Sequence, residues 1–184
     1  MRRWALPAVL AAGVAIAAWF FLLRTTTAEP TLTIALPTAV IGSGEDAIGV
    51  SPNGTLLVWQ GPPEEGTLPA LPLSVPPKSG RLAGPALEQA RVLGAAPAPL
   101  RPCIASSRYG ESGVDVELRS GIELRFGDPS RAAEKWRSAV AVLADPSITA
   151  ADYVDLHSPT RPTVYGEGHV LPSAEEGSGA GCGE

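Results

Sequence analysis

One stretch decides the fold of this chain: Gly121–Val164, with the sequence GIELRFGDPSRAAEKWRSAVAVLADPSITAADYVDLHSPTRPTV. It opens with alternating apolar and polar residues, the period of a half-buried strand, and then changes to the spacing of an amphipathic helix. Asp128 is a suitable N-cap and Pro129 suits the first helical position, so we predict a helix over about Pro129–Leu143. Another extended run begins at Tyr153. The order strand, helix, loop, strand predicts an α+β fold.

The predicted helix carries an apolar stripe that must pack on a sheet. Trp136 lies within this stripe, and its position favours a place in the core over a surface role. The charged residues of the helix, Lys135 among them, are left for solvent or a partner. The stripe comprises Ala132, Ala133, Trp136, Ala139, Val140 and Leu143.

The residues before this helix predict a sheet with one packed face. Val114–Arg119 and Ile122–Phe126 each alternate apolar residues with polar or charged ones, and a Ser-Gly turn separates them. Together with Leu100–Ser107 they predict an antiparallel meander, one face of which is in water. A short helix is predicted over Pro85–Leu93, and Gly94 stands where it would stop.

The segments nearer the N-terminus are shorter and less regular. Thr31–Leu36 alternates polar and apolar residues and predicts a strand. Asp46–Val50 and Thr55–Trp59 flank an Asn-Gly pair, which is a strong hairpin signal. Gly61–Gly80 is so rich in proline and glycine that we expect it to run extended over a surface.

An uncharged apolar run, Trp4–Leu23, predicts a membrane-spanning helix. At about 1.5 Å per residue its length matches the roughly 30 Å hydrocarbon core of a bilayer. Arg2 and Arg3 precede the run and Arg24 alone closes it, so the positive-inside bias places the N-terminus in the cytoplasm. The alternative is a cleaved signal peptide, whose apolar core is normally about 7–15 residues, so the length favours an anchor.

Composition argues against several classes of function. The chain has a net charge of −5 and shows no basic stripe, which argues against nucleic-acid binding. Cys103 and Cys182 would face an oxidising compartment, and whether they pair is left open. With two cysteines and two histidines spread widely along the chain, we expect no metal site and no cofactor.

Asp155, His157 and Ser158 are the residue types of a hydrolase site. Asp155 and His157 are two residues apart, which places them on the same face of a strand. The sequence shows neither a nucleophile elbow nor a glycine-rich oxyanion loop before a helix. Because a catalytic site needs several convergent parts, we expect no enzymatic activity and no small-molecule substrate.

The ordered set of segments resembles the FtsQ/DivIB family, whose members are bitopic bacterial cell-division proteins. In that family a cytoplasmic tail and one membrane span lead into a POTRA domain, and a β-domain of mixed sheet and two helices follows. The family's POTRA-ending strand is matched by Thr31–Leu36, its Gly turn by Val50–Gly54 and its LPxL segment by Leu68–Leu71. The helix after Gly127-Asp128 and the strand Tyr153–Leu156 then follow in family order.

The resemblance implies a domain plan with a shortened N-terminal part. A cytoplasmic tail at 1–3 and a transmembrane helix at 4–23 are followed by a linker and POTRA remnant at 24–49. An extracytoplasmic β-domain at 50–166, with a mixed or antiparallel sheet and two helices, precedes a disordered tail at 167–184. Six residues separate Arg24 from Thr31, too few for a whole POTRA domain. A mis-assigned start codon and a naturally short form would both produce this pattern.

The resemblance also implies a partner and a binding site. In the family the FtsB partner, itself paired with FtsL, docks on the last strand and the helix before it. An exposed edge strand presents unpaired N–H and C=O groups to which a partner segment can add as a strand. The alternative is that Pro159 and Pro162 simply protect this edge. His157 stands where many relatives have arginine, so one polar contact is expected to differ or to depend on pH. The residues carried over are Tyr153, Val154, Asp155, Leu156, His157, Ser158, Thr163 and Val164, with Lys135 on the helix.

These observations together predict a non-enzymatic, single-pass type II membrane scaffold of the divisome that acts in septation. We expect it in the cell membrane at the division septum, with the C-terminal domain outside. The alternatives are an anchored or secreted envelope enzyme and an envelope assembly factor that uses a POTRA-like strand. Oligomeric state and order of recruitment stay open.

Overall fold

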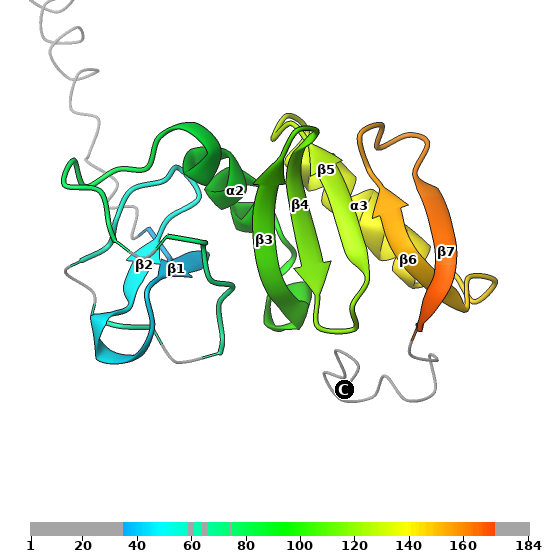
Figure 1. Ribbon diagram of the computed structural model, residues 1–184, viewed down its shortest axis with the longest axis horizontal. Coiled ribbons are helices and arrows are strands. Elements are labelled where there is room, and N and C mark those ends of the chain that lie inside the picture. The colour runs from blue at the N-terminus through cyan, green and yellow to red at the C-terminus, as the bar shows by residue number, and fades with distance from the viewer. Residues whose placement is uncertain (1–34, 59–60, 64–65, 74, 172–184) are drawn as a thin grey trace, which may run out of the picture. The chain divides into compact units, whose positions relative to one another are not determined.

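A five-stranded sheet dominates the computed structural model, which describes residues 35–58, 61–63, 66–73 and 75–171. The strands lie in the order in which they occur along the chain, from β3 to β7 (Figure 1). All neighbours are antiparallel except β5 and β6, which are parallel. The strands are β3 (Ile104–Gly110), β4 (Gly113–Leu118), β5 (Glu123–Gly127), β6 (Ala150–Asp155) and β7 (Thr163–Val170).

The first three strands form the predicted meander. Their apolar side chains lie on one face and are buried, including Val116 and Leu124, which are fully inaccessible. Gly121 allows the tight turn between β4 and β5 by adopting a φ of 87°. The predicted start at Leu100 is wrong, because Ala98–Cys103 forms the 3-10 helix η2 and β3 begins only at Ile104. Pro102 lies inside η2 and has no N–H to contribute to a strand ladder.

The helix α3 (Ala132–Leu143) connects β5 to the parallel strand β6, as parallel pairing requires a crossover. The predicted helix exists, but its predicted start at Pro129 is wrong. The Asp128 carboxylate accepts a hydrogen bond from the Ser130 N–H (2.7 Å) and so closes a turn before the helix. Arg131 then adopts a left-handed conformation with a φ of 56° and takes the N-cap position.

The buried face of α3 is rotated relative to the predicted stripe. Trp136 is fully buried, as predicted, and packs against Phe126 with ring centroids 4.8 Å apart. Ala133 and Val140, predicted to be in the stripe, are exposed, whereas Lys135, predicted to be left for solvent or a partner, is 1% exposed. The residues of α3 that are buried are Ala132, Lys135, Trp136, Ala139 and Val142.

The helix α2 (Gly84–Gly94) confirms the predicted short helix and its end at Gly94. Ala90 and Leu93 are buried, and α2 packs on the face of β3 and β4 while α3 packs on β5. The Trp136 indole N–H donates a hydrogen bond to the Val92 carbonyl (2.8 Å), which ties the two helices together. Both helices therefore cover one face of the sheet, and within the described residues the opposite face, called the open face below, carries no α-helix (Figure 1).

The N-terminal part of the described chain forms a second, two-stranded sheet. Strands β1 (Ala39–Ile41) and β2 (Ile48–Val50) pair antiparallel, with the 3-10 helix η1 (Gly44–Asp46) between them. Within the proline-rich segment Gly61–Gly80, residues 69–71 run beside β1: the Val40 N–H donates to the Pro69 carbonyl (3.0 Å) and the Leu71 N–H to the Val40 carbonyl (2.8 Å). Leu71 is buried, so this part does not run over a surface as predicted. The predicted Asn-Gly turn is present, since the Gly54 N–H donates to the Ser51 carbonyl (2.9 Å).

Other N-terminal predictions need correction. Beyond the Asn-Gly turn, the described residues of the predicted strand Thr55–Trp59 contribute only isolated bridges, such as that between Val50 and Leu56, and no regular strand. Trp59 itself lies outside the described residues. Of the predicted strand Thr31–Leu36, Ala35 and Leu36 are not in a strand, and the other residues lie outside the described part of the chain.

Two further predictions concern the ends of the chain. Strand β7 continues to Val170 and Leu171 is buried, so the order of the chain extends beyond the predicted limit at Gly166. Within the described residues no helix is long and apolar enough to span a membrane. The predicted span at 4–23 and Cys182 lie outside the described residues, while Cys103 is disulfide-bonded.

Candidate interaction site at the β7 edge

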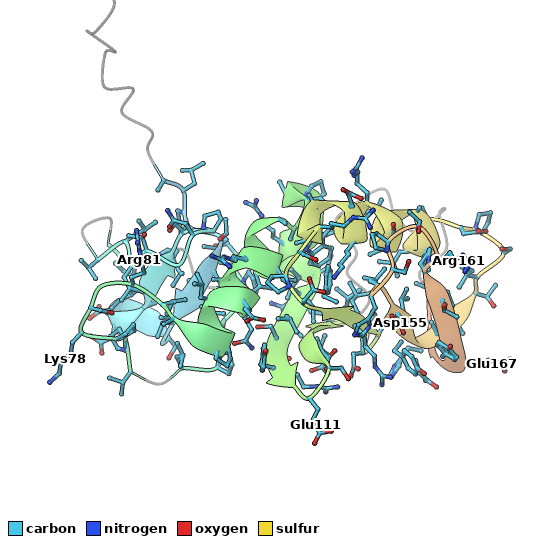
Figure 2. The ribbon with its side chains drawn as sticks, turned by 90° about the horizontal axis from the view of Figure 1, so that it is seen from above. Lys78, Arg81, Glu111, Asp155, Arg161 and Glu167 are labelled. Atoms are coloured by element: carbon cyan, nitrogen blue, oxygen red, sulfur yellow. The ribbon has the colours of Figure 1, made fainter. Side chains whose placement is uncertain are left out.

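Strand β7 is the outermost strand of the five-stranded sheet (Figure 1). Within the described part of the chain its one neighbour in the sheet is β6. Seven of its eight residues are exposed; the exposed fraction is 46% for Tyr165 and 76% for Val170. Figure 2 shows the charged side chains of Arg161 and Glu167 beside this strand. The site is therefore a solvent-exposed edge.

The predicted terminal strand is in fact two strands, and only the second forms the edge. Tyr153, Val154 and Asp155 belong to β6, which pairs with β5 on one side and β7 on the other. Leu156 follows β6 directly, and its N–H donates to the Arg125 carbonyl (2.9 Å). These four residues therefore have no free backbone edge, which corrects the expectation that they form the outer strand. The chain reverses in the turn from Ser158 to Arg161, where the Arg161 N–H donates to the Ser158 carbonyl (3.0 Å).

Register determines which backbone groups of β7 face outward. The Leu156 N–H points to β5, and successive residues of a strand direct their backbone groups to opposite sides, so Asp155 and Tyr153 face β7. Their register partners, Thr163 and Tyr165, therefore face back towards β6. Val164 lies between them, so its N–H and C=O point to the open edge.

The regular part of this edge is short. Beyond Tyr165 the pairing of β6 and β7 shifts register, and the Asp152 side chain fills the irregularity. The Gly168 N–H donates to the Asp152 carboxylate (2.9 Å), and a Cβ on Gly166 or Gly168 would collide with that side chain. This β-bulge limits the regular, paired run of β7 before it to Thr163–Tyr165.

Side chains on the open face form a continuous stack that ends at the edge. The Arg125 guanidinium carbon lies 3.5 Å from the centroid of the Tyr153 ring. The Tyr153 ring in turn stacks on Tyr165, with centroids 4.7 Å apart and planes 20° from parallel. Tyr165 and Arg125 were not predicted as site residues. The signal in the sequence is that Tyr165 follows Thr163 at the two-residue period of a strand face.

Asp155 and His157 form a surface pair next to this stack. The His157 Nδ1 lies 2.8 Å from the Asp155 carboxylate, which also accepts a hydrogen bond from the His157 N–H (2.9 Å). Burial by itself would raise the pKa of Asp155, but these two hydrogen bonds outweigh burial and lower it. The Ser158 hydroxyl lies 3.4 Å from that of Thr160, so the Ser158 contact described in the structure is not with His157. Asp155, His157 and Ser158 are therefore close in sequence without being assembled as a hydrolase triad.

Lys135, predicted as a partner contact, is held inside the domain. Its Nζ donates to the carbonyls of Phe126 (2.8 Å) and Asp128 (2.9 Å) and lies 3.8 Å from the Asp128 carboxylate. Burial lowers the pKa of this amine, which the nearby Asp128 opposes. Lys135 thus fixes the turn between β5 and α3, and its ammonium is not exposed to a partner in this structure.

Comparison with known proteins yields little. No protein-family model matches the chain, and no curated protein matches it. One similar solved structure is the major extracytoplasmic domain of the trans isomer of the bacterial cell division protein DivIB from Geobacillus stearothermophilus. Its TM-score is 0.42 and its identity 19%, over 61% of this chain and 93% of that chain.

Proposed function

We propose that this protein is a non-enzymatic scaffold of the bacterial cell-division machinery, anchored in the cell membrane by one span at 4–23. Its domain lies outside the cytoplasm and binds an FtsB/FtsL-type partner at the β7 edge. The partner segment adds to the sheet as a further strand beside Thr163 and Val164. The sequence resemblance to the FtsQ/DivIB family supplies the identity of the partner.

The observation that carries the proposal is the open edge of β7. Val164 directs its N–H and C=O outward, and its side chain is only partly buried. An edge strand of this kind is a template for another strand, because each outward backbone group lacks a ladder partner within the described sheet. Tyr153, Val154 and Asp155 of β6 then contribute indirectly, because they pair with β7 and hold it in register.

A proline substitution tests this edge directly. Val164→Pro removes the outward N–H and blocks pairing, while it leaves the inward bonds of Thr163 and Tyr165 intact. The full chain, purified in detergent, is titrated with the C-terminal peptide of the FtsB-type protein encoded in the same genome. We expect Val164→Pro to abolish binding, and Val164→Ala, which keeps the N–H, to retain it. Circular dichroism checks that both variants are folded, and equal binding by parent and Val164→Pro would refute augmentation at this edge.

The proposed topology has its own test. A reporter that is active only outside the cytoplasm, fused after Glu184, should be active while the full-length chain stays in the membrane fraction. Replacing Arg2 and Arg3 with glutamate should weaken the orientation, because flanking positive charge sets it. Release of a shortened, soluble chain would show instead that the N-terminal run is a cleaved signal peptide.

A further inference from the structure

Cys103 is held in place by the fold, and its sulfur is already bonded. Cys103 ends η2 and is half-buried, and its carbonyl accepts a hydrogen bond from the Arg119 N–H (2.8 Å). It is disulfide-bonded, and the sequence has one other cysteine, Cys182. Two cysteines allow one pairing within a chain, and this pairing requires that Cys182 reaches Cys103.

The topology brings the start of β3 and the end of β7 to the same end of the sheet. Strand β3 is antiparallel to β4, β4 to β5 and β6 to β7, while β5 and β6 are parallel. The chain therefore enters β3 and leaves β7 at one end of the sheet (Figure 1). Leu171, directly after β7, is fixed there, because it is buried and its N–H donates to the Thr149 carbonyl (2.9 Å). Four strand spacings separate β3 from β7, which is roughly 19 Å.

The segment between Leu171 and Cys182 has the right length to cross this distance. Residues 172–181 read PSAEEGSGAG and carry no bulky apolar side chain. When extended, a chain from residue 171 to residue 182 spans about 36 Å. A glycine-rich chain of the same length has a root-mean-square end-to-end distance of about 18 Å. Because this distance matches the span, the effective concentration of one thiol at the other is close to its maximum.

We infer that a disulfide between Cys103 and Cys182 holds residues 172–181 as a strap across the end of the sheet where β3 begins and β7 ends. The strap joins the ends of the two outer strands covalently. When the bond forms, the two thiols lose two protons and two electrons, and a protein disulfide of an oxidising compartment takes them up and becomes a dithiol. This inference goes beyond the proposed function, because it involves no binding partner.

The strap should stabilise the folded state by a moderate factor. In the unfolded chain the bond closes a loop of about 80 residues, whereas in the folded chain it closes a loop of only about 11 residues. The entropic cost of closure grows with the logarithm of loop length, so the bond penalises the unfolded state more. The equilibrium constant for folding should rise about 20-fold, which corresponds to an increase of about 5 °C in Tm.

Peptide mapping tests the pairing itself. The full chain, purified in detergent, is equilibrated in a buffer of oxidised and reduced glutathione, and its free thiols are then alkylated. Trypsin should release residues 92–108 joined to residues 138–184, and dithiothreitol should separate the two peptides. Non-reducing electrophoresis should show a monomer. Two alkylated cysteines, or a dimer that dithiothreitol dissociates, would overturn the inference.

Two variants of the strap test whether it crosses the sheet. Deletion of residues 173–180 leaves about 10 Å of chain between residue 171 and Cys182, and a disulfide adds about 5.5 Å between Cα atoms. The total is shorter than the span of roughly 19 Å, so the linked peptide should no longer form within one chain. Replacement of the same eight residues by glycine and serine keeps the length and should keep the linked peptide. A deletion variant that still forms the bond within one chain would show that the strap does not follow this path.

Thermal unfolding tests the contribution of the strap to stability. Cys182→Ser should lower Tm by about 5 °C. Dithiothreitol should lower the Tm of the parent by the same amount and leave that of Cys182→Ser unchanged, because both treatments break the same bond. Ser178→Ala, within the strap, is the control and should match the parent. Circular dichroism checks that each variant is folded. A mapped disulfide whose loss leaves Tm unchanged would refute the stabilising role of the strap.

Discussion

The two outer strands of the five-stranded sheet differ in how their open-face side chains are used. On β3 the polar side chains are held by carboxylates of the neighbouring strands: Ser106 donates to Glu117 (2.9 Å), and Arg108 pairs with Asp115 (3.3 Å) and Glu123. On β7 the open face carries an aromatic side chain instead: the Tyr165 ring stacks on Tyr153 and is partly exposed.

Charge and register explain why these edges behave differently. A charged side chain such as Arg108, 60% exposed and lying along β3, discourages another strand from pairing there. Burial and the nearby Glu123 raise the pKa of Asp115, and the positive charge of Arg108 opposes this rise. Hydrogen bonds from Arg125 and Arg108 outweigh the effect of burial and lower the pKa of Glu123. The polar side chains of β3 are thus paired with side chains of β4 and β5. At β7, in contrast, the Tyr165 ring is partly exposed and the Val164 N–H and C=O point outward.

The largest expected effect comes from the core that both edges share. Trp136→Ala should lower the free energy of unfolding by about 3–5 kcal/mol, because it empties a fully buried site and removes the hydrogen bond to Val92. Val140→Ala, on the exposed side of the same helix, is the control and should change it by less than about 0.5 kcal/mol. Denaturant titration measures both, and similar values for the two variants would contradict the placement of Trp136.

A pair of proline variants should separate the two edges. The Leu118 N–H bonds the Ile122 carbonyl on the β5 side, so by alternation Val114 also faces β5, and its β3 partner Tyr109 directs its backbone groups outward. Tyr109→Pro is therefore the β3 counterpart of Val164→Pro. We expect Val164→Pro to abolish peptide binding and Tyr109→Pro to leave it unchanged, as measured by titration. An equal loss of peptide binding in the two variants would mean that the peptide does not bind specifically at the β7 edge.

Lys135 should make stability depend on pH at the β5–α3 turn. Burial lowers its pKa in the folded state from the ordinary 10.5, so the folded chain releases this proton at a lower pH than the unfolded chain. In the window between the lowered value and 10.5 the unfolded state binds more protons, and stability gains from rising pH. Denaturant titrations of parent and Lys135→Met should show this gain in the parent only. A parallel pH dependence of the two would show that Lys135 is not responsible.

The smallest expected effect is at the β3 edge. Arg108→Ala should lower stability by no more than about 1 kcal/mol, because exposed ion pairs contribute little. The difference from the parent should shrink further at high salt, which screens these charges. Thermal unfolding at low and high salt measures it, and a loss of several kcal/mol would show that the cluster has a larger structural role.

Much of the sheet was predictable because its pattern is local. Val116 and Leu124 alternate with charged residues, and that period alone places them on the packed face. The helix boundaries were less predictable: Asp128 looked like an N-cap, but its carboxylate accepts from Ser130 within a turn instead. Capping and turn formation use the same short polar side chain, so the sequence does not choose between them.

The candidate site shows the limit of such patterns. The sequence by itself determined that an extended run begins at Tyr153 and that the chain near Thr163 and Val164 is extended too, since alternation and proline positions are properties of neighbouring residues. Only the tertiary structure decided that β6 is internal, that Val164 faces outward and that Lys135 is buried. The first two facts depend on which strands are neighbours in the sheet. The burial of Lys135 depends on the Phe126 and Asp128 carbonyls, which accept hydrogen bonds from its ammonium. The local periodicity of the sequence contains neither kind of information.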